Sequence, residues 1–108
     1  MAIDFAQIFK DAVKAGVEAA KPGGKMAEDW IKKSAAANED ALLSIADSLA
    51  AGRISTSTAR FQFQENEFAL KSEASALKVI VKASAQAAVN GFFGSLRSAL
   101  LSALKVAL

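Results

Sequence analysis

The sequence predicts an all-α fold with about four helices, and three observations support this prediction. Alanine, the best helix-forming residue, occurs 25 times in 108 residues. Larger apolar residues recur at intervals of three and four, the spacing that places them on one side of a helix. Residues that end helices stand between these periodic segments. The predicted helices span residues 4–21, 25–51, 55–90 and 92–108 of a single domain (1–108), as a long antiparallel hairpin or bundle flanked by shorter amphipathic helices.

The first two helices are delimited by clear local signals. An apolar stripe that begins with Phe5 and Phe9 follows Asp4, a residue type that caps helix N-termini. The sequence Pro22-Gly23-Gly24 ends this first helix. The second helix keeps its apolar spacing as far as Gly52, and glycine readily takes the left-handed conformation that often ends a helix.

The segment 54–64 is ambiguous, because its alternating Phe and Gln residues are typical of a strand. A lone strand, however, would have no partner in this chain. Phe63, Leu70 and Leu77 are seven residues apart, which is typical of a packed helix. We therefore expect a third helix that continues to Asn90-Gly91, a pair that marks a stop or a kink.

The last predicted helix is the most apolar, and a helix of this kind is not a free surface element. It is expected to pack within its own bundle, to contact another chain or to lie on a membrane surface. Rows of small residues at spacing four, from Gly91 to Ala107, would let another helix approach closely. Trp30 is expected to anchor core or interface packing. The predicted contact residues are Phe92, Phe93, Leu96, Leu100, Leu104 and Leu108, with Phe5, Phe9 and Trp30.

Positive charge is concentrated in the second half of the chain. Residues 1–50 contain 6 lysines and 8 acids, whereas residues 51–108 contain 7 basic residues and 3 acids, the last of which is Glu73. This half could attract an anionic partner, and the residues expected to contact it are Lys71, Lys78, Lys82, Arg97 and Lys105. A solvated stripe, partly paired through Glu67 to Lys71, is the simpler interpretation. Nucleic acid is not favoured, because it would require denser basic residues with accessible aromatic rings.

The residue types in the sequence argue against catalysis and against a metal or cofactor site. Cys and His are absent, which removes thiol nucleophiles, imidazole bases and the usual zinc, haem and copper ligands. The pattern Ser-x-x-Lys occurs at 75–78 and 102–105, but without the companion motifs that serine–lysine enzymes need. Gly24-Lys25 lacks the other residues of a phosphate-binding loop. We expect a protein that is not an enzyme and binds no cofactor.

The expected function is association through helices. The leading hypothesis is a protein that forms a homo-oligomer, or docks on a helical protein partner, through its apolar C-terminal helix. The Phe-containing faces of the first and third helices are expected to take part in contacts between copies. The alternatives are a peripheral or pore-forming protein on an anionic membrane surface, and a bundle that binds an apolar small molecule. The sequence begins without a recognisable signal peptide and contains no long uncharged stretch, so we expect a cytoplasmic protein, with peripheral membrane attachment as the alternative.

Overall fold

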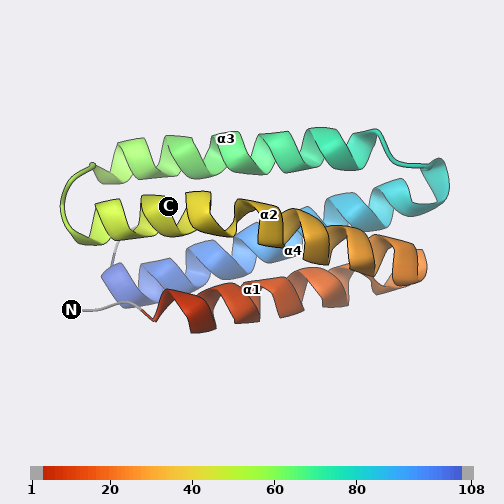
Figure 1. Cartoon of the computed structure of the whole chain (residues 1–108), viewed down its shortest axis with the longest axis horizontal. Helices are drawn as coiled ribbons and strands as arrows, with labels where there is room; N and C mark the ends of the chain where they lie inside the picture. The colour runs from red at the N-terminus through yellow and green to blue at the C-terminus, as the bar shows by residue number, and fades with distance from the viewer. Residues whose placement is uncertain (1–3, 106–108) are drawn as a thin grey trace.

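The computed structural model describes residues 4–105, which form four α-helices that run alternately in opposite directions (Figure 1). These are α1 (Phe5–Ala20), α2 (Gly24–Ala50), α3 (Thr56–Ser75) and α4 (Val79–Leu104), and a single 3-10 turn, η1 (Lys21–Gly23), joins α1 to α2. Residues 4–105 contain no strand. The prediction of an all-α bundle with about four helices is confirmed, and so is the helical interpretation of the ambiguous third segment.

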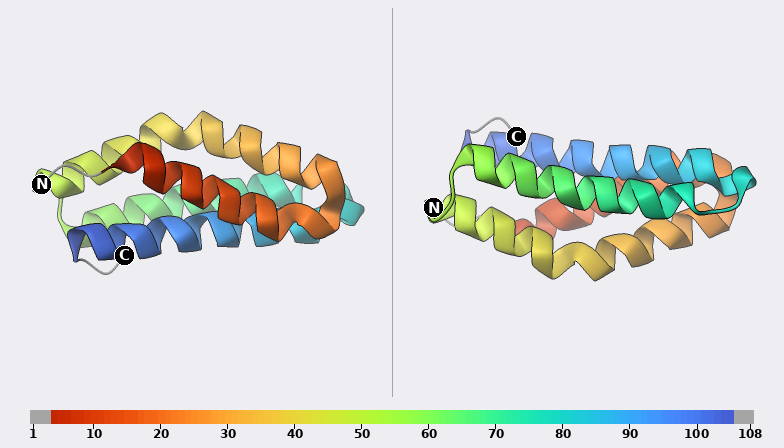
Figure 2. Two further views of the ribbon diagram at one scale, coloured as in Figure 1. Left: turned by 90° about the horizontal axis from the view of Figure 1, so that it is seen from below. Right: turned by 90° about the horizontal axis from the view of Figure 1, so that it is seen from above.

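Helices α2 and α4 occupy the middle of the molecule, with α1 on one side and α3 on the other (Figures 1 and 2). Helix α1 packs along α4 and α2, whereas α3 packs on α2 and α4 and makes no contact with α1. The described part of the chain is elongated, with extents of 42 × 22 × 20 Å. One side of α3 is therefore free along the length of the bundle.

Local sequence signals explain the boundaries of the first two helices and the start of the third. The side chain of Asp4 accepts a hydrogen bond of 3.1 Å from the backbone N–H of Gln7, which caps α1. Gly24, the first residue of α2, and Gly52, two residues after its end, have φ values of 76° and 73°, in the left-handed region that favours glycine. Ser55 caps α3 in the same way as Asp4 caps α1, by accepting from the backbone N–H of Thr58 at 3.1 Å.

The boundary between the third and fourth helices differs from the prediction. The predicted break at Asn90-Gly91 does not exist, because α4 continues through both residues. Instead α3 ends at Ser75, and the chain reverses through Ala76, Leu77 and Lys78. The predicted third helix (55–90) is thus divided, and its second part belongs to α4. At the other end of α4, Lys105 closes the helix with a left-handed φ of 59°, and residues 106–108 lie outside the described part of the chain.

Gly91 lies inside an unbroken helix, and its lack of a side chain allows close packing against α1. A Cβ atom at Gly91 would lie 3.1 Å from the carbonyl oxygen of Ala15 and 3.3 Å from the Cβ of Ala19, both in α1. Gly16 has the same role in α1, since its Cβ would lie 3.2 Å from the carbonyl oxygen of Ala88 in α4. The two glycines therefore let the backbones of α1 and α4 approach closely, and helical hydrogen bonding is kept at both.

The core is centred on aromatic rings from α1 and α4. The ring of Phe9 meets that of Phe92 at a centroid distance of 5.6 Å and an angle of 82°, and Phe92 meets Phe93 at 5.1 Å and 88°. These are the edge-to-face arrangements that aromatic pairs favour. Helix α3 contributes mainly Phe63 and Leu70. Among residues 4–105 no buried side chain is polar, so packing of apolar groups accounts for the interior.

Candidate interaction surface

Most of the residues predicted to contact another molecule lie within the core of the chain itself. The fully buried members of this set are Phe92, Phe93, Leu96 and Leu100, the nearly buried ones are Phe5 and Phe9, and the partly buried ones are Leu104 and Trp30. Leu108 lies outside the described residues. The broad apolar face of α4 is covered by the other helices of the same chain, which corrects the expected position of a contact surface.

The physical reason for this correction is the close packing of α1 on α4. Gly91, predicted to favour contact with another chain, lies against α1 of its own chain. The second row of small residues, which consists of Gly94, Ser98 and Ser102, is exposed, and nothing lies within 4 Å of the position of a Cβ at Gly94. One row of small residues in α4 thus packs against α1, and the other row is exposed to solvent.

Six large apolar side chains are exposed among the described residues, and none of them is among the individual residues predicted to make contacts, although a Phe-containing face of the third helix was expected to take part. They are Met26, Phe61, Phe68, Val79, Ile80 and Leu101. Two of them are aromatic residues in the middle of α3. Three others lie where α2 and α4 begin, at the same end of the bundle. The exposed apolar surface is therefore concentrated in two places.

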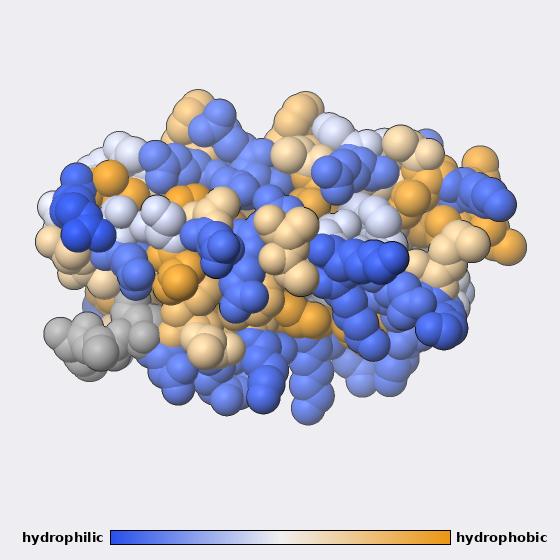
Figure 3. Space-filling model, in the orientation of Figure 1, coloured by the Kyte–Doolittle hydropathy of each residue, from blue (hydrophilic) through white to orange (hydrophobic). Residues whose placement is uncertain are grey.

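Phe61 and Phe68 lie on the side of α3 that faces directly away from the core. At about 100° per residue the two side chains differ by only about 20° around the helix, and they are about 10 Å apart along its axis. Leu70, which is buried, lies on the opposite side of the same helix. The exposed fractions are 61% for Phe61 and 73% for Phe68, and Figure 3 shows apolar side chains projecting from the edge formed by α3.

We define the outer stripe of α3 as the exposed residues centred on these two rings. Its members are Ser57, Phe61, Gln64, Glu65, Phe68 and Ser72. Glu65 is the one ionisable residue among the six. The signal for this stripe was present in the sequence, since residues 61 and 68 share the seven-residue spacing of Phe63 and Leu70. That spacing gave α3 a second apolar line, on the side opposite the first.

The five basic residues predicted to contact an anionic partner do not form one patch. Lys71 and Arg97 both bind Glu67: the Nζ of Lys71 lies 3.3 Å from its Oε2, and Arg97 pairs with its Oε1. The predicted pairing of Glu67 with Lys71 is confirmed, and Arg97 adds a link from α4 to α3. The guanidinium of Arg97 also lies over the ring of Phe93, 5.8 Å from its centroid.

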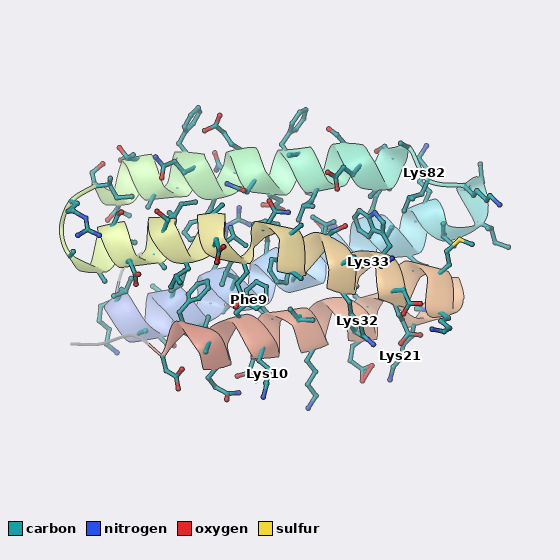
Figure 4. The ribbon with its side chains drawn as sticks, in the orientation of Figure 1. Phe9, Lys10, Lys21, Lys32, Lys33 and Lys82 are labelled. Carbon is teal, nitrogen blue, oxygen red and sulfur yellow. The ribbon has the colours of Figure 1, made fainter. Side chains whose placement is uncertain are left out.

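The other three predicted basic residues lie at opposite ends of the bundle. Lys78 and Lys82 are at the start of α4, whereas Lys105 is at its end. Figure 4 shows Lys82 near the end of the molecule at which α3 turns into α4, and it shows Lys21, Lys32 and Lys33 in the same half. Lys10 lies toward the other end of α1 (Figure 4). Sequence position alone could not reveal this separation.

Exposed ion pairs link neighbouring turns in the first half of the chain. Lys25 donates a hydrogen bond of 2.9 Å to Asp29, which raises the pKa of Lys25 and lowers that of Asp29. Lys21 donates to Glu18 at 3.0 Å, which raises the pKa of Lys21. Pairs exposed to solvent contribute little to stability. Their charges are paired locally, between residues three or four apart on the same face of the chain.

Two further observations concern the described residues only. No group of three or more His, Cys, Asp or Glu side chains within residues 4–105 is arranged to hold a metal ion. In the same range, none of the helices combines the length and the apolar character needed to cross a membrane.

Comparison of the chain with family models, curated proteins and solved structures gave no match.

Proposed function

We propose that this protein is a non-catalytic interaction protein that associates with a second copy of itself through the outer stripe of α3. The observation that carries the proposal is the exposure of Phe61 and Phe68 on the side of α3 opposite the core. Aromatic residues are enriched at the centres of protein interfaces, where they provide much of the binding free energy. The apolar face of α4, expected to serve this purpose, is already occupied by the chain itself.

The seven-residue spacing makes the outer stripe self-complementary. When a second copy of α3 lies antiparallel, with a twofold axis between Gln64 and Glu65, Phe61 of each copy meets Phe68 of the other. In the same arrangement Ser57 meets Ser72, so that hydroxyl groups flank the aromatic contacts. Such a contact is isologous and closes as a dimer. The stripe has one ionisable residue, Glu65, so few charges lose their water when it is covered.

The exposed area of the rings sets the expected affinity. A fully buried Phe contributes about 1.5–3 kcal/mol, and the exposed fractions of the four rings in the dimer together amount to between two and three full rings. Their burial therefore supplies roughly 4–8 kcal/mol. Association costs on the order of 4–15 kcal/mol in lost freedom of motion. The rings alone therefore leave at most about 4 kcal/mol in favour of association, so we expect a weak dimer with a Kd of about 1 mM or above.

Measurement of mass against concentration tests the proposal. In sedimentation equilibrium over about 0.1 to 5 mM, a range that brackets such a dissociation constant, the average mass of the wild-type protein should rise toward that of a dimer. The double variant Phe61→Ser/Phe68→Ser should remain monomeric and keep its helix content, because neither ring contributes to the core. Leu101→Ser is the control, since it removes an exposed apolar side chain from α4.

Two results would contradict the proposal. One is a wild-type protein that stays monomeric throughout this range, and the other is a dimer that the double variant forms equally well. A dimer weakened by Leu101→Ser and not by the double variant would assign association to α4 instead.

A further inference from the structure

The start of α4 has the most exposed apolar side chains of residues 4–105. Val79 is 88% exposed and Ile80 is 82% exposed. Their neighbours Leu77 and Val81 are partly and fully buried against the core. Because these two residues face inward at the turn, Val79 and Ile80 between them face outward. Figure 3 shows apolar side chains gathered at this end of the molecule.

Met26, which is also exposed, belongs to the same end of the bundle. Ser84 lies one helical turn after Ile80 on the same side of α4, and its Cβ is only 2.6 Å from the position that a Cβ at Gly23 would take. The start of α2, with Met26 in its first turn, therefore lies beside the start of α4. We call this surface the bundle tip and define it as Met26, Lys78, Val79, Ile80 and Lys82.

The charges next to Val79 and Ile80 on α4 are positive, whereas on α2 the acids Glu28 and Asp29 follow Met26 by two and three residues, and Asp29 is paired with Lys25. Lys78 precedes Val79 and Ile80, Lys82 follows them, and neither lysine forms an ion pair with another described residue. Helix α4 begins without a side-chain cap and without an acid in its first turn, so the positive end of its dipole adds to the two lysines. Glu73, the acid nearest in sequence, lies in the last turn of α3, before the turn that leads into α4.

We infer that the bundle tip docks on an anionic lipid surface, with Val79 and Ile80 inserted and Lys78 and Lys82 against the lipid phosphates. Three apolar side chains cannot supply the roughly 800 Å² that each partner contributes to a stable protein interface. A lipid surface needs less area, because a few inserted side chains and a few lysines act together. The outer stripe of α3 is a separate surface, so this inference does not depend on self-association.

Binding to vesicles tests both parts of the contact. On vesicles that contain phosphatidylserine, Val79→Ser/Ile80→Ser should lower the partition coefficient by roughly 100-fold. Lys78→Gln/Lys82→Gln should lower the partition coefficient by roughly 30-fold. Each lysine near such a surface raises the partition coefficient by about fivefold, and the two effects multiply. Binding to pure phosphatidylcholine vesicles should be weak and unaffected by the lysine changes.

A matched control separates docking at the tip from general attraction of a basic protein. Lys10→Gln/Lys14→Gln makes the same change of charge on the exposed side of α1. This variant should bind phosphatidylserine vesicles almost as well as the wild type. Equal losses for the two lysine pairs would overturn the inference, since attraction would then depend on net charge alone. If Val79→Ser/Ile80→Ser lowered the average molecular mass measured by sedimentation equilibrium, the inference would also be overturned, because the tip would then be a contact between protein copies.

Insertion can be followed directly, because the chain contains no cysteine. Ile80→Cys labelled with an environment-sensitive fluorophore should brighten and shift to shorter wavelength when vesicles are added. Leu101→Cys, labelled at an exposed apolar position near the end of α4, should not change. The same response at both positions, or at neither, would contradict insertion of the tip.

Discussion

Replacement of two glycines in α4 by alanine should have different effects on the stability of the protein. Gly91 and Gly94 are three residues apart in one helix, and Gly→Ala in a helix interior normally gains about 1 kcal/mol. At Gly94 nothing lies within 4 Å of the new Cβ, so the full gain is expected. At Gly91 the new Cβ would lie 3.1 Å from the carbonyl oxygen of Ala15 and 3.3 Å from the Cβ of Ala19.

The contact at Gly91 is tighter than ordinary van der Waals packing, and one of its partners is backbone. Helices α1 and α4 would have to separate by a few tenths of an ångström along a closely packed interface, and overpacking of this kind costs about 1–3 kcal/mol. The cost offsets or exceeds the gain in helix propensity. Gly91→Ala should therefore be less stable than Gly94→Ala by about 1–3 kcal/mol.

Thermal and urea unfolding followed by circular dichroism would measure this difference. For a domain of this size 1 kcal/mol corresponds to roughly 4–8 °C in Tm. Gly94→Ala should raise the Tm by an amount near the lower end of that range, and Gly91→Ala should leave it unchanged or lower it. Equal stabilisation by the two changes would refute the close contact of α1 with α4 at Gly91.

Three further predictions concern α3. Phe63→Ala should lower the free energy of unfolding by about 3–5 kcal/mol, because its ring is fully buried, whereas Phe68→Ser should change it by no more than about 0.5 kcal/mol; urea unfolding would compare them. Glu67→Gln should cost about 1 kcal/mol, since it removes a mostly buried carboxylate that pairs with Arg97, and this loss should shrink in a variant that also carries Arg97→Gln. Glu65→Gln should strengthen the proposed dimer several-fold, because two Glu65 carboxylates would come close at its twofold axis, and sedimentation equilibrium would detect an unchanged or weaker dimer if that geometry is wrong.

The sequence was sufficient for the class of fold and for the first two helices, because their boundaries depend on local chemistry. Asp4, the Pro-Gly-Gly segment at 22–24 and Gly52 act within a few residues of their own position. The boundary between α3 and α4 depends instead on tertiary contacts. The true turn at 76–78 contains neither glycine nor proline, and the glycine that suggested a break at Gly91 is needed for packing against α1.

The interaction surfaces were harder to predict than the core. The apolar residues of α4 were correctly recognised as residues that must be covered, but a sequence does not state whether its own helices or another molecule will cover them. The outcome depends on the order of helices around the bundle. Phe61 was obscured for a different reason: it belongs to an alternating Phe and Gln segment in which Phe63 takes the core position. The spacing of Phe63 with Leu70 and Leu77 favoured Phe63 for the core, but whether another helix would cover Phe61 depends on how α3 packs on α2 and α4.

The absence of contact between α3 and α1 has a consequence for how the molecule opens. Helix α3 is held by a narrow apolar line and by the link from Glu67 to Arg97, whereas α1 and α4 share a long closely packed interface. Local opening requires the least free energy where few buried groups must be separated. Backbone amides of α3 should therefore exchange with deuterium sooner than those at the centres of α1 and α4. The helix with the outward aromatic rings is then also the one that can detach while the other three remain folded together.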